Sequence, residues 1–368
     1  MNSTHKPPPA LCGFFEIFRC ALLGTILFLI PGSAPALDVV HDTTNASNQN
    51  YRLPEDPNEL LKFDNEMRAF FATRIHRGLL LENFLDEIES AIHSEDGLHF
   101  QYESDGVYDV REAFRRRRGN CLTYSMLVVA IAREFGINAK FNEVSIYPRW
   151  YRTGRIVLLT GHINVRVEAA FDSYEIDIKL NDNLRTGRSS AHVIDDARAF
   201  AEVYGNVGVY KLAAGDAQNA LRLMEKATTV DPTSAPAWAN LGTALTHVGQ
   251  LERAQKYYER ALAIEPNLPA ALSGLASLHR KNGRIAEAEK LERKILRYRE
   301  RNPYYLLSKA RDELSDGNFT SARSHLKRAI NIKDDEPELY ELMSEVARKQ
   351  GLDKEAKRWI EKSKRVAS

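Results

Sequence analysis

Cysteine is scarce in this chain of 368 residues, which has only Cys12, Cys20 and Cys121. So few thiols exclude a small secreted scaffold held together by many disulfides, and they exclude a zinc site with three or four thiolate ligands. An excess of charge of one sign is also lacking, because 51 basic residues face 50 acidic ones. The overall charge therefore favours no nucleic-acid partner.

The composition also lacks the biases of disordered or fibrous chains. Apolar residues make up 43% of the chain and charged residues 27%, both ordinary for a globular protein. At roughly 150 residues per domain, the length predicts two domains, or three.

The first 36 residues are typical of a secretory signal peptide. The apolar run Cys20–Ile30 has 11 residues, too short for the roughly 20 that span a bilayer. It is followed by Ala34–Ala36, a small-x-small cleavage site. The alternative is an uncleaved anchor, because residues 14–18 extend the apolar stretch. We expect an exported protein, periplasmic or secreted, that meets a membrane only if this segment is retained.

Two kinds of pattern follow one another between residues 37 and 192. Residues 37–56 are polar and rich in turn formers, which predicts a flexible leader. Helical spacing then predicts helices, and alternating apolar residues predict antiparallel strands, with a polar patch at 181–191. The resulting domain, 57–192, is of the α+β class. The expected helices are 58–71, 79–93, 111–118 and 120–135, and the expected strands are 140–146, 156–160, 162–169 and 174–178.

Internal repetition with a period of 34 residues begins at residue 201. Glycine recurs five times at this spacing, and alanine recurs five times a few residues later. The period and the consensus residues of the second repeat resemble tetratricopeptide repeats, which implies an all-α solenoid over 193–368 that binds a protein partner on its concave face. The repeats are 201–234, 235–268, 269–302, 303–336 and 337–368, and the consensus residues are Trp238, Leu241, Gly242, Ala254, Tyr258, Ala261 and Pro266.

Cys121 lies where a helix is predicted to begin. It follows the turn Gly119-Asn120 and precedes an apolar helix that Gly136 ends. Backbone N–H groups and the helix dipole favour an anion at a helix N-terminus, and the thiolate is the nucleophilic form of cysteine. The alternative is a small buried cysteine at the start of a core helix. Five arginines just upstream add positive charge: Arg111, Arg115, Arg116, Arg117 and Arg118.

His162 is the histidine best placed to take a proton from a thiol. It opens the strand 162–169, where it alternates with apolar residues and so lies on the polar face. Asp177 lies on the polar face of the next strand. Because the apolar faces of a hairpin must coincide, His162 and Asp177 are expected on the same side. The alternative is an exposed polar face without function.

The distance between these two residues depends on the hairpin loop. A loop centred on Ala169–Ala170 puts His162 and Asp177 directly opposite each other. A loop centred on Phe171–Asp172 has better turn chemistry but offsets them. The sequence leaves the two registers open.

These segments resemble the transglutaminase-like superfamily of papain-fold thiol enzymes. The resemblance covers about residues 95–180 and rests on Gly-Asn-Cys before a helix, and on the later Gly-His-Ile-Asn-Val and Tyr-Glu-Ile-Asp-Ile segments. In that family a cysteine, a histidine and an aspartate form a catalytic triad, which implies Cys121, His162 and Asp177 here. The tryptophan often found before the family's aspartate is replaced by Tyr174.

The resemblance implies a papain-like mechanism without a cofactor. The thiolate attacks a carboxamide or peptide carbonyl, and the backbone N–H of Cys121 meets the oxyanion with a second donor from Gln101, Tyr102 or Tyr108. One alternative role is a metal site, since Cys, His and Asp are all ligands. Arg111–Arg118 could form a phosphate site, but an arginine-rich turn without interleaved aromatic residues is more often a solvated face.

The sequence therefore predicts a cysteine peptidase or amidase rather than a cross-linking transglutaminase, acting on a protein or peptide. The alternative is an inactive scaffold in the cell envelope that works through its repeats.

Overall fold

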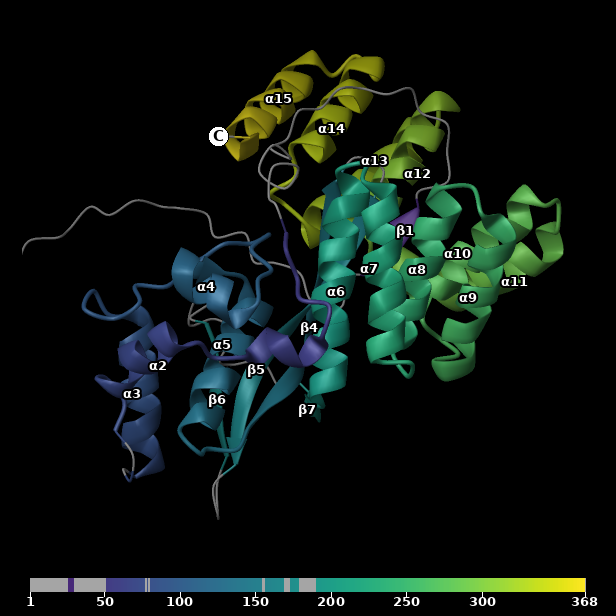
Figure 1. Cartoon of the computed structure of the whole chain (residues 1–368). Helices are drawn as coiled ribbons and strands as arrows, with labels where there is room; N and C mark the ends of the chain where they lie inside the picture. The colour runs from purple at the N-terminus through teal and green to yellow at the C-terminus, as the bar shows by residue number, and fades with distance from the viewer. Residues whose placement is uncertain are drawn as a thin grey trace, which may run out of the picture.

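The computed structural model describes residues 26–29, 51–76, 78, 80–153, 156–168, 173–178 and 190–367. Cys12, Cys20, the cleavage site Ala34–Ala36 and most of the polar patch lie outside these residues. Within them, a mixed α+β region is followed by a solenoid of paired helices (Figure 1). The predicted fold class is confirmed.

Short helices with acidic or amide caps build the first part of the chain. At four of the five helices, the side chain of an Asp or Asn accepts a hydrogen bond from a backbone N–H of the first turn. In the last of these helices, every residue from Cys121 to Ala132 is buried, so it forms the centre of the domain. The elements are the 3-10 helix η1 (Pro57–Leu61), α2 (Asn65–Ala72), α3 (Leu81–His93), α4 (Val110–Arg116) and α5 (Cys121–Glu134).

The main sheet has the order β1-β5-β4-β7, and β6 pairs with β5. The stretches 156–160 and 162–169, expected as two strands, form the single strand β5. Strand β7 was not predicted. The strands are β1 (Ile26–Leu29), β4 (Ala139–Thr153), β5 (Ile156–Glu168), β6 (Ser173–Ile176) and β7 (Ser190–Ile194), and β2 (Gln101–Tyr102) pairs separately with β3 (Arg118–Gly119).

Five helix pairs follow at the predicted period. A glycine with φ between 74° and 83° ends each first helix, a conformation that L side chains rarely adopt. The alanines of the second helices are buried where the two helices of a pair approach. The pairs are α6 (Asp196–Ala213) with α7 (Ala217–Val230), α8 (Ala235–His247) with α9 (Leu251–Ile264), α10 (Pro269–Lys281) with α11 (Ile285–Arg299), α12 (Pro303–Ser315) with α13 (Phe319–Ile332), and α14 (Pro337–Lys349) with α15 (Asp353–Ala367).

Strand β1 belongs to the segment that we expect to be a signal peptide. It pairs antiparallel with Ile156–Leu159 of β5 and contacts α8 and α10 (Figure 1). The α+β region and the first repeats also share one hydrophobic core, which extends from Leu60 to Leu278. The two regions are therefore continuous in their packing.

None of the described helices combines the length and apolar character needed to cross a membrane.

Candidate active site

Cys121 is the first residue of α5 and is 1% exposed. Asn120 caps the helix, because its Oδ1 accepts a hydrogen bond from the backbone N–H of Thr123 at 3.0 Å. The backbone N–H of Asn120 donates to the carbonyl of Gly106 at 2.8 Å. The start of α5 is thus fixed both by its own cap and by a loop from earlier in the chain.

That loop, Glu103–Gly106, packs closely against the residue before the cap. A Cβ atom on Gly106 would lie 3.0 Å from Cα of Gly119, and a Cβ atom on Gly119 would collide with the side chain of Thr123. A side chain at Gly119 would therefore displace Thr123, and one at Gly106 would press the loop away from Gly119. Thr123 also donates its hydroxyl to the Gly106 carbonyl at 2.9 Å.

His162 is 4% exposed on β5 and is bonded to Asp177. Its Nε2 lies 2.6 Å from Oδ2 of Asp177. The other oxygen, Oδ1, is buried and has no hydrogen-bond partner among the described residues. His162 is thus the cation that can neutralise this carboxylate.

The hairpin register lies between the two that the sequence allowed. Val165 pairs with Ile176 and Glu168 pairs with Ser173, so the loop is 169–172. Continued past the end of β6, this register puts Asp177 opposite Asn164. Asp177 is therefore the diagonal neighbour of His162 on the predicted common face, within reach of its ring.

The pKa of His162 is raised to about 10 from its ordinary value of 6.5. Burial lowers this pKa, but hydrogen bonds to Asp177 and Cys121 and their negative charges outweigh burial. Because Nε2 is used by Asp177, Nδ1 is the ring nitrogen left for the sulfur of Cys121. The structure thus brings the three predicted site residues together.

Tyr124 and His93 form a second layer that the sequence did not indicate. The Tyr124 hydroxyl, one turn along α5 from Cys121, hydrogen-bonds Nε2 of His93 at 3.0 Å. Burial raises the pKa of Tyr124, as do the charges of Glu89 and Asp177. The negative charge of Asp177 thus contributes to the raised pKa of Tyr124.

The upstream arginines differ from expectation, because carboxylates pair with four of the five. Arg111 contacts Glu59 and Asp109, and Arg115 and Arg116 both contact Glu112. Arg118 lies 3.6 Å from Glu103. Their positive charge is largely compensated locally, so they offer little to a thiolate or a phosphate.

The three candidates for a second oxyanion donor have different surroundings. Gln101 is exposed, and the hydroxyl of Tyr108 donates to Glu103 at 2.7 Å. Tyr102 is half-buried and pairs in register with Gly119, two residues before Cys121.

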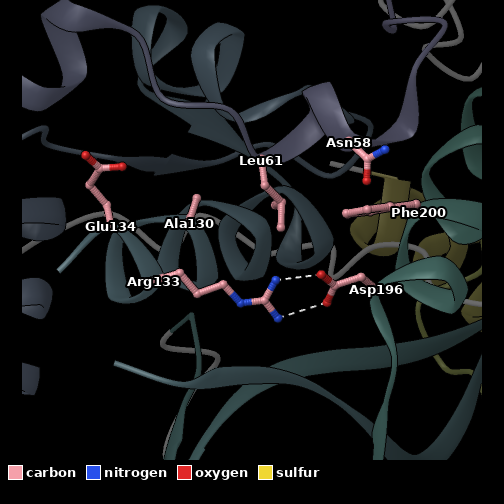
Figure 2. A pocket seen from close by; sticks show the side chains of 7 residues that line it. All are labelled: Asn58, Leu61, Ala130, Arg133, Glu134, Asp196 and Phe200. Carbon is pink, nitrogen blue, oxygen red and sulfur yellow. Dashed lines mark hydrogen bonds and ion pairs between the residues drawn. The ribbon is translucent and has the colours of Figure 1, made fainter. Parts of the chain in front are cut away.

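A pocket of about 350 Å³ lies at the other end of α5. Figure 2 shows Arg133 of α5 and Asp196 of α6 joined to each other in its lining by two hydrogen bonds of 2.6 and 2.9 Å. Its remaining lining residues are Asn58, Leu61, Ala130, Glu134 and Phe200. The pocket does not include Cys121, His162 or Asp177.

In the described part of the chain, no three His, Cys, Asp or Glu side chains are grouped so as to hold a metal ion.

Two family models match the chain. The model of the cilia and flagella-associated protein 70 C-terminal domain matches residues 148–368. The chain belongs to this family. The model of the transglutaminase-like superfamily matches residues 81–208. Together the two matches confirm the resemblances to tetratricopeptide repeats and to the transglutaminase-like superfamily seen in the sequence. The two matches overlap over residues 148–208, from the end of β4 into α6.

Solved structures similar to this chain are helical-repeat proteins of low identity. MamA is 18% identical with a TM-score of 0.31, and the match covers 44% of this chain and 94% of MamA. PilF of Pseudomonas aeruginosa is 19% identical with a TM-score of 0.36, and the match covers 46% of this chain and 77% of pilF. The APC/C hetero-tetramer Cut9–Hcn1 is 18% identical with a TM-score of 0.34, and the match covers 45% of this chain and 33% of the matched chain. No curated protein matches this chain.

Proposed function

We propose that the chain is an exported thiol enzyme in which Cys121, His162 and Asp177 act as a catalytic triad on an amide or peptide bond. One observation supports this most. His162 is held between Asp177, at 2.6 Å, and Cys121, and these contacts raise its pKa to about 10. A histidine in this position keeps its proton at neutral pH and stabilises a thiolate beside it.

The first half-reaction forms a thioester. The Cys121 sulfur attacks the carbonyl carbon, and the oxygen takes up negative charge near the N-terminus of α5, where the backbone N–H of Cys121 and the Tyr102 hydroxyl are the proposed donors. The C–N bond then breaks, and the departing amine takes the proton from the His162 imidazolium.

The second half-reaction releases the acyl group. His162 accepts a proton from water, whose oxygen attacks the thioester carbonyl, and the sulfur leaves as the thiolate. An amine in place of water gives transfer instead of hydrolysis. Hydrolysis is favoured because water needs no binding site of its own.

The test uses the full-length protein and a peptide mixture from digested envelope proteins. New N-termini report peptidase activity, ammonia reports amidase activity, and incorporation of a fluorescent amine reports transfer. Cys121→Ala should abolish whichever activity is present and keep the helical circular dichroism. An active Cys121→Ala protein refutes the triad.

The repeats are proposed to bind a protein partner, as repeats of this class generally do. Export through the N-terminal segment is part of the same proposal. Cleavage after Ala36 would remove β1 and leave Cys121 as the one cysteine of the mature chain. Peptide mapping of the exported protein would show Leu37 as the first residue, whereas peptides from residues 1–36 would contradict cleavage.

The second candidate function is a scaffold without catalysis. It is favoured by the burial of Cys121 and His162, which are 1% and 4% exposed, and by the location of the described pocket at the far end of α5. Alkylation by iodoacetamide at pH 6 separates the two. An enzyme reacts many times faster than free cysteine, and a scaffold reacts slowly.

A further inference from the structure

We propose that Tyr210, on the first repeat helix α6, is a positioning residue for Cys121, acting through the loop Glu103–Gly106. The inference rests on the proposed function and extends it. It makes the first repeat part of the catalytic unit.

Helix α6 is buried on nearly all sides. Apart from Lys211, every residue from Ala199 to Leu212 is buried. A helix buried on all sides lies inside a core and not on the surface of a separate module. Phe200 packs edge-on against Phe141 of β4 at 6.5 Å, so this helix also contacts the sheet.

One end of α6 contacts the end of α5, and the other end of α6 contacts the loop that holds the start of α5. Asp196, at the start of α6, pairs with Arg133 near the end of α5. Tyr210, near the end of α6, reaches the loop that holds the start of α5. The two helices are therefore antiparallel, and α6 spans the domain from the pocket of Figure 2 to the cysteine.

Tyr210 and Tyr51 both hydrogen-bond the loop Glu103–Gly106. Their rings stack at 5.8 Å with an angle of 6° between planes. Tyr210 donates its hydroxyl to the carbonyl of Ser104 at 3.3 Å, and Tyr51 donates to that of Asp105 at 2.9 Å. Two successive carbonyls are thus fixed by two stacked tyrosines from distant parts of the chain.

The same loop also hydrogen-bonds the start of α5. The next carbonyl, that of Gly106, accepts hydrogen bonds from Asn120 and Thr123, and the N–H of Glu103 donates to the carbonyl of Gly119 at 3.0 Å. A displacement of the loop therefore displaces the first turn of α5. Burial raises the pKa of Tyr210, and the charge of Cys121 contributes to that rise.

The described end of the leader belongs to this arrangement. Two further residues of this segment contact the repeats. The carbonyl of Pro54 accepts a hydrogen bond from the Tyr204 hydroxyl at 2.7 Å, and Glu55 forms an ion pair with Arg222 of α7 at 2.6 Å. Residues 51–56 thus lie between the repeats and the loop.

The test measures alkylation of Cys121 by iodoacetamide in the full-length protein, read from the Cys121 peptide by mass spectrometry. The quantity is the rate at pH 6 divided by the rate at pH 9, which cancels changes in access to the thiol. An intact pair with His162 keeps this ratio near one. An ordinary thiol is about a hundredfold slower at pH 6 than at pH 9, because little thiolate is present.

Tyr210→Ala and Tyr51→Ala should each lower the ratio by about tenfold or more, since displacement of Cys121 from the protonated His162 ring removes a charge that favours the thiolate. Tyr210→Phe, which keeps the stacked ring, should lower it only two- to threefold, in line with the loss of one weak hydrogen bond. If Tyr210→Ala fails to fold, Tyr51→Ala and Tyr210→Phe decide.

Tyr340→Ala is the matched control. Tyr340 is likewise buried, stacks on Trp359 and donates its hydroxyl to a backbone carbonyl, that of Asp334, but it lies in the fifth repeat. It should leave the ratio unchanged. Folded Tyr210→Ala and Tyr51→Ala proteins with the wild-type ratio overturn the inference alone, whereas a low ratio in the wild type contradicts the proposed function itself.

Discussion

Nε2 of His162 lies 2.6 Å from Oδ2 of Asp177, although the two residues do not face each other in the hairpin. The ion pair is formed along the diagonal of the two strands, where side chains still come within reach. It connects the last residues of the hairpin to the first residue of α5, since the same ring also hydrogen-bonds Cys121.

Asp177→Asn should shift the pH dependence of activity. The carboxylate is one of two hydrogen-bond partners that raise the pKa of His162 to about 10. Without its charge this pKa falls, and the alkaline limb of kcat/KM should move to lower pH. We expect a loss of about ten- to a hundredfold at pH 8, since a misoriented histidine costs up to about 10⁴-fold in related triads. An unchanged alkaline limb would show that Asp177 does not act on His162.

The stability of the protein should depend on the protonation of His162. The folded pKa of about 10 is above the unfolded value of 6.5, so protonated His162 stabilises the fold fully below 6.5. This contribution, on the order of a few kcal/mol, is lost as the pH rises through about 10.

Urea unfolding at pH 6, 8 and 10 measures this loss. The wild type should lose more stability than His162→Gln between pH 8 and 10. Parallel curves for the two proteins would contradict the raised pKa.

Gly274→Ala should destabilise the repeats. A Cβ atom there would lie 2.6 Å from the hydroxyl of the buried Tyr258, which donates to Thr243. Overpacking of this kind costs about 1–3 kcal/mol. Gly205→Ala in α6 is the control, because a Cβ atom there meets nothing within 4 Å and alanine favours a helix by up to about 1 kcal/mol. Thermal unfolding should rank Gly205→Ala at or above the wild type, with Gly274→Ala clearly below it.

Asp196→Asn should have only a small effect on stability. Its carboxylate is 40% exposed and Arg133 is 35% exposed, and exposed ion pairs contribute about 0–1 kcal/mol. Arg133 also donates to the carbonyl of Ala139, so Arg133→Ala should cost more than Asp196→Asn. Urea unfolding measures both, and the difference between wild type and Asp196→Asn should shrink in 1 M salt. An equal effect of the two changes would assign the whole role of Arg133 to the ion pair.

The placement of Cys121 at a helix start, and of His162 and Asp177 on one face, could be predicted from local rules. Gly119 and Asn120 ended one segment and capped the next, and strand alternation put His162 and Asp177 on one face. The register could not be predicted, because the sequence allowed two loop centres, Ala169–Ala170 and Phe171–Asp172, and the pairing of Val165 with Ile176 lies between them. Strand β7 was missed because His192 is the centre of a short edge strand in a polar stretch.

The role of α6 was missed for a different reason. The period of 34 assigned this helix to the repeats, where one buried stripe is enough. The sequence did contain a signal, since Phe200, Val209 and Leu212 make α6 apolar on more than one side. A pattern this broad predicts a helix enclosed between two units. The partners of the five arginines, such as Glu59, could not be found without the fold.

The pH dependence of Cys121 alkylation tests the central claim most directly, with the wild type and His162→Gln compared in the full-length protein. The account predicts a wild-type rate that is nearly constant from pH 6 to pH 9, and a His162→Gln rate that falls by about a hundredfold over the same change toward pH 6. A wild-type rate that falls just as steeply as that of His162→Gln would contradict it.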